Sequence, residues 1–321
     1  MAIKRQVKVC TIGGGSGMPV VNKALVEVGF NDIHSIVTTF DSGGYSGRMK
    51  TDERGKLLAF SDYWRSLISL WKNGRQKAIW EEMLRYRDGR GRNFGDIFFQ
   101  FMTEKTGNLA NVDRLFSELT GAELKGEVIP VSLEPADVCW QTESGKQYVG
   151  EHYFDEYRMS EDRVKKIWLE PMVEASEEAK QTLKMAEIII VGPGSIYGSI
   201  LVNFLPQGMI TAYRSSQARK ILIANLTSVA NETAKLDAAT YYKIFSNYLG
   251  KNSFDDIIEP DFTKINPKLL TEVKRNYAYE HSYLYSSGSQ VNDIVVVDRK
   301  NLRLRHDVKK LSLLFKRILR S

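Results

Sequence analysis

Hydrophobic positions along the chain fall into two alternating patterns. Short, nearly continuous apolar runs of about four to eight residues predict buried strands. Between them, apolar residues spaced three or four apart predict helices with one buried face. This alternation favours a doubly wound α/β fold, in which helices cover a mostly parallel, Rossmann-like sheet. The expected strands are residues 7–12, 33–40, 128–133, 188–191, 221–226 and 294–297.

Residues 55–120 depart from this alternation, because helical patterns follow one another there without a strand between them. We therefore expect a helical block in this segment. Other helices are expected from about Pro19 to Val28 and from the end of the fourth predicted strand to about Arg214. The expected helices of the block are residues 57–71, 76–86, 94–104 and 112–119.

Residues 135–160 predict a β-hairpin excursion from the sheet. Its two strands, 138–142 and 147–151, are separated by a short polar segment that contains a glycine. Residues 167–169 add a further short strand. We interpret residues 1–321 as one large α/β domain, with the hairpin as a small β subdomain within it.

Composition limits the classes of protein that fit. Cys10 and Cys139 are the two cysteines, and they form neither a disulfide framework nor a metal-binding spacing. No apolar run reaches the roughly 18–20 residues that cross a membrane. Residues 7–12 are too few for the core of a signal peptide. We therefore expect a cytoplasmic protein that does not use a membrane.

The net charge of +6 comes from one end of the chain. Residues 299–321 hold nine Lys or Arg and one acid, so the rest of the chain is slightly acidic. Residues 308–319 predict a helix with an apolar stripe beside these basic residues. Such a helix can lie on a membrane or bind nucleic acid, but it is also what a terminal helix needs to pack on a sheet. We expect packing, and we expect no nucleic-acid partner.

A glycine loop, Gly13-Gly-Gly-Ser-Gly17, separates the first predicted strand from a helix that begins near Pro19. Glycine lets the backbone approach a ligand, and free N–H groups at a helix N-terminus favour phosphate. The loop is not a dinucleotide fingerprint, because Met18 stands where the third glycine is required. It is not a Walker loop either, since no Gly-Lys-Ser/Thr follows. The alternative interpretation is a tight turn without a ligand.

A second polar segment, Thr38–Arg48, follows the second predicted strand. An acid at this place, here Asp41, often binds a ribose hydroxyl. Arg48 offers a guanidinium that can bind phosphate through two N–H groups. A flexible surface loop is the alternative.

A third polar segment, Gly192-Pro-Gly-Ser195, repeats the logic of the first loop after another buried strand. Ser195 can cap the following helix or contact a phosphate oxygen. Asn225 ends the next strand, where ligand sites of open α/β sheets gather. We therefore predict that both glycine loops face one cleft at the carboxyl edge of the sheet. The four histidines show no zinc-ligand spacing, and we interpret each as structural.

Several of these segments, taken in order, resemble one superfamily. It contains the 2-phospho-lactate transferases (CofD-like) and the gluconeogenesis factors (YvcK-like), and the second branch is the more similar. The segments that carry the resemblance are Gly13–Gly17, Asp41–Arg48, Gly192–Tyr197, Asn225–Thr227 with Glu232-Thr233, and Arg305–Asp307.

The resemblance implies a regulatory protein that binds a uridine-diphosphate sugar and is linked to carbon metabolism and cell-wall growth. The alternative is a transferase that moves a phospholactyl-type group from a nucleotide-activated donor, with Asp41 and Mg²⁺. Ser42 replaces a second family aspartate, which weakens the case for a metal. A third alternative is a scaffold that acts through the basic helix. We expect a nucleotide or nucleotide sugar as partner and leave a homodimer open.

Departures from the family pattern occur elsewhere too. Asp96 stands where an asparagine is usual, Asn231 stands where a glycine is usual, and Asp62 matches a family Pro-Pro-Gly-Asp stretch only faintly. The ligand-binding residues that the loops and the resemblance imply are Gly13, Gly14, Gly15, Ser16, Gly17, Asp41, Ser42, Gly43, Gly44, Ser46, Arg48, Asp62, Asn93, Asp96, Gly192, Pro193, Gly194, Ser195, Tyr197, Asn225, Thr227, Glu232, Thr233 and Arg305.

Overall fold

The structure of the protein is a computed structural model. It describes residues 7–40, 58–72, 74–89, 91–150, 162–228, 232–233, 236–276 and 291–319, apart from the side chain of residue 110.

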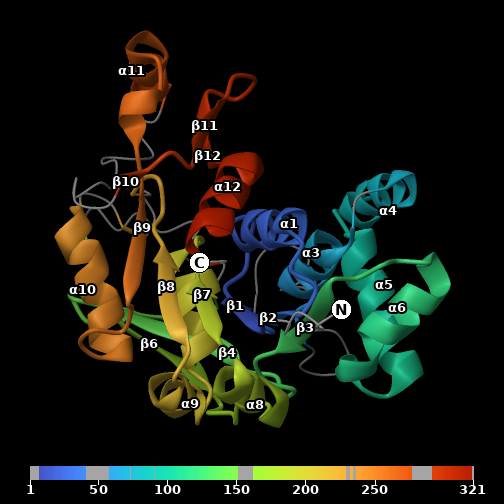
Figure 1. The fold of residues 1–321 in the computed structure, drawn as a ribbon. Coiled ribbons are helices and arrows are strands. Elements are labelled where there is room, and N and C mark those ends of the chain that lie inside the picture. Colours follow the sequence, from blue (N-terminus) through green and yellow to red (C-terminus); the bar gives the residue numbers. More distant parts are fainter. Residues whose placement is uncertain are drawn as a thin grey trace.

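A seven-stranded, fully parallel sheet forms the centre of the fold (Figure 1). Its strand order is β10-β9-β8-β7-β1-β2-β3, so the chain builds outward in both directions from the β1–β7 pair. This reversal of direction is the switch point at which open α/β sheets form ligand crevices. The strands are β1 (Val9–Ile12), β2 (Ile33–Val37), β3 (Gly126–Pro130), β7 (Ile188–Val191), β8 (Arg219–Ile223), β9 (Asp256–Pro260) and β10 (Val291–Asn292).

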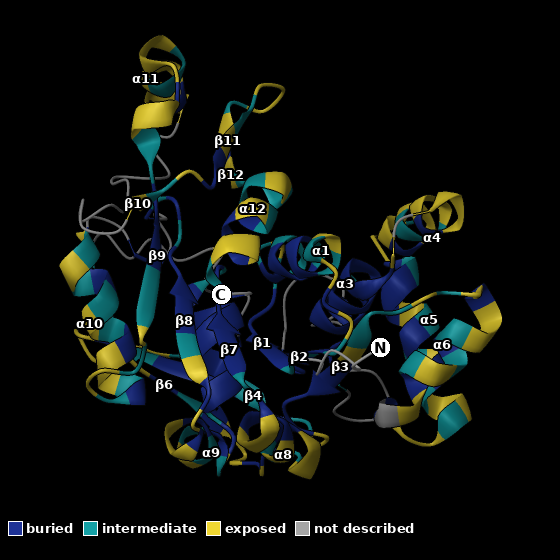
Figure 2. Cartoon of the chain, in the orientation of Figure 1, coloured by how far each residue is buried: buried dark blue, intermediate teal, exposed yellow. Residues whose placement is uncertain are grey.

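Both faces of the sheet are buried, which explains the continuous apolar runs of its strands (Figure 2). In β7, Ile188 and Ile190 belong to one core, and Ile189 and Val191 belong to the core on the opposite face. Helices on the first face are α1 (Met18–Val28), α3 (Ser61–Leu70) and α12 (Val308–Ile318). Helices on the second face are α8 (Glu177–Met185), α9 (Met209–Ser215) and α10 (Ala238–Leu249).

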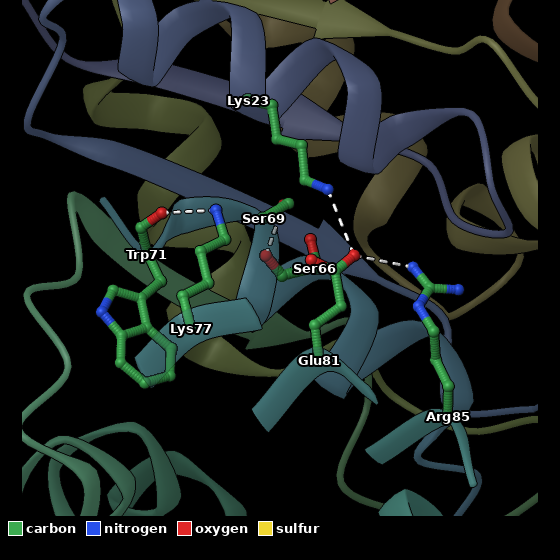
Figure 3. Close-up of polar contacts among 7 residues, drawn as sticks. All are labelled: Lys23, Ser66, Ser69, Trp71, Lys77, Glu81 and Arg85. Carbon is green, nitrogen blue, oxygen red and sulfur yellow. Dashed lines mark hydrogen bonds and ion pairs between the residues drawn. The ribbon is translucent and has the colours of Figure 1, made fainter. Parts of the chain in front are cut away.

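The expected helical block is present. It includes α3, and its other helices lie beside the first face: α4 (Arg75–Arg85), α5 (Phe94–Thr106), the short 3-10 helix η1 (Leu109–Asn111) and α6 (Val112–Thr120). Charged side chains connect this block to α1, as Figure 3 shows. Lys23 of α1 pairs with Glu81 of α4 at 3.2 Å, and Arg85 pairs with the same carboxylate at 2.9 Å. Lys77 donates to the Trp71 carbonyl oxygen at 2.6 Å, and burial lowers the pKa of the Lys77 ammonium to about 8.

The predicted hairpin is also present, within a three-stranded antiparallel sheet of order β5-β4-β6. Its strands are β4 (Asp137–Thr142), β5 (Gln147–Val149) and β6 (Val164–Glu170). Trp140 of β4 is fully buried against the second face of the main sheet. The excursion is therefore part of the cover of that face.

One predicted helix is wrong. Instead of a continuous helix to Arg214, the chain forms a π-helical turn, η2 (Ile196–Ile200), then a 3-10 turn, η3 (Leu201–Phe204), before α9. Pro206 lacks the N–H that a continuing helix needs. Gly208 then takes a left-handed conformation at φ 95°, which starts α9 in a new direction.

The last predicted strand has a different role from the one expected. It is β11 (Val295–Asp298), which pairs antiparallel with β12 (Arg303–His306) in a separate two-stranded sheet. The sequence pattern did not predict β9, β10, β12, α8, α10, α11 (Pro267–Asn276) or the short 3-10 helix η4 (Phe262–Lys264).

The C-terminal helix α12 packs as expected. Its residues Leu311, Leu314 and Phe315 are buried in the core of the first face, beside α1. Ser312 donates to the Ala24 carbonyl oxygen of α1 at 3.2 Å. Within the described residues, no helix is long and apolar enough to cross a membrane.

Candidate functional site

A cavity of about 360 Å³ lies where β1, β7 and β8 end at the carboxyl edge of the sheet. Both glycine loops contribute to its wall, so the prediction of one shared cleft is confirmed. The site forms there because the loops follow adjacent strands, β1 and β7, at the switch point. The lining residues are Ser16, Gly17, Val20, Pro193, Gly194, Ser195, Asn225, Leu226, Thr227, Glu232, Leu304, Arg305 and His306.

The two loops meet at Gly17. A Cβ atom at this position would lie 2.3 Å from the Pro193 carbonyl oxygen, so only glycine allows the loops to approach this closely. The amide N–H groups of Ser16 and Gly17 make no hydrogen bond to any residue that the structure describes. They precede α1, whose N-terminus carries partial positive charge. This corner of the cavity can therefore accept an anion.

Asp62 of α3 supports the first loop from outside the cavity lining. Its Oδ1 accepts the Gly15 N–H at 2.7 Å, and its Oδ2 would lie 1.9 Å from a Cβ atom at Gly14. Arg65 lies 3.5 Å from the Asp62 carboxylate. Gly14 is thus required for contact with Asp62, and Asp62 fixes the shape of the loop.

Asn225, directly beyond β8, fixes the second loop. Its Oδ1 accepts the Gly194 N–H at 3.1 Å, and its Nδ2 donates to the Gly194 carbonyl oxygen at 2.8 Å. Gly192 has φ 73°, and its N–H donates to the Ile12 carbonyl oxygen of β1 at 3.0 Å. These bonds hold the second loop against the end of β1.

Of the two roles considered for Ser195, the structure contains the cap. Its Oγ accepts the Gly198 N–H at 2.9 Å and donates to Glu232. The second carboxylate oxygen of Glu232 accepts the Ile196 N–H at 3.0 Å. Glu232 therefore shapes this loop as well as lining the cavity.

The strand β12 brings Arg305 and His306 to the cavity wall. The Nε of Arg305 lies 3.2 Å from Asp298 Oδ2, and its side chain is half exposed. His306 Nε2 lies 3.0 Å from the Ala224 carbonyl oxygen. Burial lowers the pKa of His306 to about 4, so the imidazole is neutral near pH 7. Asp307 caps α12 by accepting the Lys310 N–H at 2.8 Å.

The structure does not place every predicted residue at the cavity. Asn93 caps α5 and donates to the Leu84 carbonyl oxygen of α4 at 3.1 Å. Asp96 accepts the indole N–H of Trp64, in α3, at 3.0 Å, so both residues connect helices of the block. Tyr197 and Thr233 are buried outside the lining, while Thr227 and Glu232 line it. Residues 41–48 and Asn231 lie outside the described residues. This group includes the predicted Asp41, Ser42, Gly43, Gly44, Ser46 and Arg48.

The residues predicted from sequence did not include His306, which the structure places in the cavity wall. It lies within Arg305–Asp307, one of the segments that carry the resemblance, but a lone histidine has no spacing that indicates a ligand, so the sequence favours a structural role. Its contact with Ala224 joins positions 82 residues apart, which no local pattern reveals.

For a metal, the described residues contain no group of three or more His, Cys, Asp or Glu side chains that could hold one. The proposed Mg²⁺ at Asp41 stays a prediction.

The fold and the cavity define a doubly wound α/β protein whose candidate site lies between two glycine loops at the switch point of its sheet. The family model described as 2-phospho-L-lactate transferase CofD matches residues 9–302, so the chain belongs to this family. This confirms the superfamily that the ordered motifs indicate.

The names of individual relatives match the gluconeogenesis-factor branch of the superfamily. The chain is 28% identical over 319 residues to a protein of Bacillus subtilis named gluconeogenesis factor, covering 95% of this chain and 96% of that one. A protein of the same name from Halalkalibacterium halodurans is 27% identical, covering 96% and 95%. A crystal structure of a UPF0052 family member from Bacillus halodurans matches with a TM-score of 0.82 and 25% identity, covering 97% of this chain and 98% of that one.

Proposed function

We propose that the chain is a cytoplasmic regulatory protein of the gluconeogenesis-factor type whose cavity binds a nucleotide sugar of the uridine-diphosphate kind. The single observation that carries the proposal is the contact of the two glycine loops at Gly17 and Pro193 around one cavity. A ligand between them meets backbone N–H groups, a helix N-terminus and an arginine together. This combination suits a phosphate group.

The rest of the cavity wall suits the remainder of a nucleotide. Val20, Leu226 and Leu304 supply apolar surface for a base. Asn225 and Thr227 supply polar groups near the end of β8, although the carboxamide of Asn225 is already bonded to Gly194. The volume of about 360 Å³ is within the range of small-molecule sites.

Two observations support a role in regulation rather than in turnover. They are the names of the relatives and the hydrogen bonds that already occupy the Glu232 carboxylate in the cavity wall. Glu232 is the acidic residue of the described lining, and its carboxylate is bonded to Ser195 and Ile196. We propose in addition the link to carbon metabolism and cell-wall growth that the resemblance implies.

A second candidate is the transferase reaction, which the description of the matching family favours. It would use Asp41 with Mg²⁺ to transfer a phospho-linked group from a nucleotide-activated donor. Turnover measured with such a donor and Mg²⁺ separates the two candidates, because a regulatory protein binds the donor without consuming it.

A thermal-shift screen over nucleotides and nucleotide sugars tests the proposal. A ligand that binds only the folded chain raises Tm by an amount that grows with the logarithm of its concentration divided by its Kd. We expect uridine-diphosphate sugars to raise Tm and the unphosphorylated nucleoside to leave it unchanged. A nucleoside that raises Tm as much as its diphosphate sugar would contradict the proposed phosphate site.

A further inference from the structure

His306 lies in the cavity wall with one ring nitrogen bonded and the other without a partner among the described residues. Nε2 lies 3.0 Å from the Ala224 carbonyl oxygen, and a carbonyl oxygen can only accept. Nε2 therefore carries the ring proton. In the neutral imidazole, Nδ1 then has a free lone pair, and it makes no hydrogen bond to any residue that the structure describes.

A bare imidazole nitrogen has a narrow chemical preference. It accepts a hydrogen bond from an N–H or O–H group, and it repels a phosphate oxygen, whose lone pairs it would face. The anion-accepting corner, with the N–H groups of Ser16 and Gly17, is also part of the cavity wall. The cavity thus contains donors for a phosphate and an acceptor for a neutral donor group.

Because burial keeps the ring neutral, this acceptor persists near pH 7. Arg305, its neighbour on β12, pairs with Asp298 and supplies positive charge to the same wall. The two side chains therefore present opposite hydrogen-bonding characters to one ligand, with the guanidinium as donor and the imidazole as acceptor.

We propose that His306 determines the specificity of the cavity, because its Nδ1 accepts a hydrogen bond from a neutral donor of the nucleotide. This inference rests on the proposed function. Two parts of a uridine nucleotide carry such donors: the base, through its N3–H, and the ribose, through its hydroxyl groups. Removing one donor at a time distinguishes these sources.

Two variants separate the acceptor from the bond to Ala224. In His306→Gln, the carboxamide can keep a donor toward the Ala224 carbonyl oxygen but no longer presents the Nδ1 acceptor. In His306→Asn, the shorter carboxamide can keep an acceptor near Nδ1 but gives up the bond to Ala224. His306→Gln tests whether the Nδ1 acceptor recognises the nucleotide. His306→Asn allows the same test if His306→Gln folds poorly.

Isothermal titration calorimetry then compares uridine diphosphate with its N3-methyl, 2′-deoxy and 3′-deoxy analogues. For the unmodified chain, we expect one analogue to bind about threefold to tenfold more weakly, the effect of one neutral hydrogen bond. With His306→Gln, uridine diphosphate weakens by the same factor, and the penalty for that analogue disappears. His306→Asn retains part of the penalty.

The inference is overturned if His306→Gln binds uridine diphosphate as tightly as the unmodified chain. It is also overturned if the analogue penalties persist unchanged in that variant, because His306 would then act only through the fold. If the unmodified chain binds none of the four nucleotides, the proposed function fails and this inference fails with it. Absence of binding by the unmodified chain is thus distinguishable from a result in which only the variants behave differently from the expectation.

Discussion

Asn225 bonds to both backbone polar groups of Gly194, accepting the Gly194 N–H at 3.1 Å and donating to the Gly194 carbonyl oxygen at 2.8 Å. A carboxamide is suited to this arrangement, because it carries one acceptor and one donor group side by side. The residue beyond β8 thereby sets the shape of the loop beyond β7.

Asn225→Asp should disturb this loop more than Asn225→Ala. The aspartate places a second carboxylate oxygen against the Gly194 carbonyl oxygen, whereas alanine only removes the two bonds. We expect Asn225→Ala to lower the free energy of unfolding by about 1–2 kcal/mol. Urea unfolding of both variants measures the effect. Equal stability of the aspartate variant and the unmodified chain would show that the carboxamide is not needed.

Gly17→Ala should separate the two loops. The new methyl group would lie 2.3 Å from the Pro193 carbonyl oxygen, a backbone atom that cannot rotate away. We expect a loss of about 1–3 kcal/mol of stability together with loss of nucleotide binding. Gly74→Ala is the matched control, because a Cβ atom there meets nothing within 4 Å. A Gly17→Ala variant that behaves like this control would mean that the loops do not meet as described.

The packing of α12 predicts that substitutions on its buried face and on its exposed face have different effects on stability. Phe315 is fully buried, and Phe315→Ala should cost about 3–5 kcal/mol through lost burial and a remaining cavity. Leu313 on the same helix is 70% exposed, so Leu313→Ala should change stability by less than about 0.5 kcal/mol. Thermal or urea unfolding compares them. Similar effects of the two changes would show that α12 is not docked on this face.

His306 should make stability depend on pH. Its pKa is about 4 in the folded chain, below the ordinary value of 6.5, so the unfolded chain takes up the proton first as pH falls. Its contribution to stability is complete above pH 6.5 and is lost between pH 6.5 and 4. The loss is on the order of 1–3 kcal/mol.

The measurement is urea unfolding of the unmodified chain and of His306→Gln at pH 7.5 and pH 4.5. The unmodified chain should lose more stability than the variant between these two values. Comparing the two proteins removes the effect of carboxylates that titrate in both. Parallel losses would show that His306 is solvated or already protonated in the folded chain.

Much of the sheet could be predicted from sequence because β1, β2, β7 and β8 are buried on both faces and read as apolar runs. The strand β9 could not be predicted from an apolar run, since Asp256 begins it and Glu259 lies inside it. Glu259 is buried, and Tyr242 of α10 donates to its carboxylate at 2.5 Å. That contact depends on tertiary packing, which a local pattern does not contain.

The candidate site also contains parts that the sequence predicts and parts that it does not. The glycine loops were predictable, because a strand, a glycine run and a helix follow one another directly in sequence. The roles of Asp62 and Glu232 were not, since each binds a loop 36 to 47 residues away in the chain. The residues suggested by the resemblance thus include side chains whose observed contacts support the loops.

The most direct test of the central claim is calorimetric titration of the intact chain with uridine diphosphate glucose, uridine diphosphate and uridine in turn. The phosphate groups are expected to meet the guanidinium of Arg305 and the N–H groups of Ser16 and Gly17, which make no hydrogen bond within the described part of the chain. We predict saturable binding of the two phosphorylated ligands, and affinity for uridine that is weaker by at least about tenfold, since charged hydrogen bonds are each worth about 1.5–3 kcal/mol. Equal affinity for all three ligands, or no binding of any of them, would contradict the account.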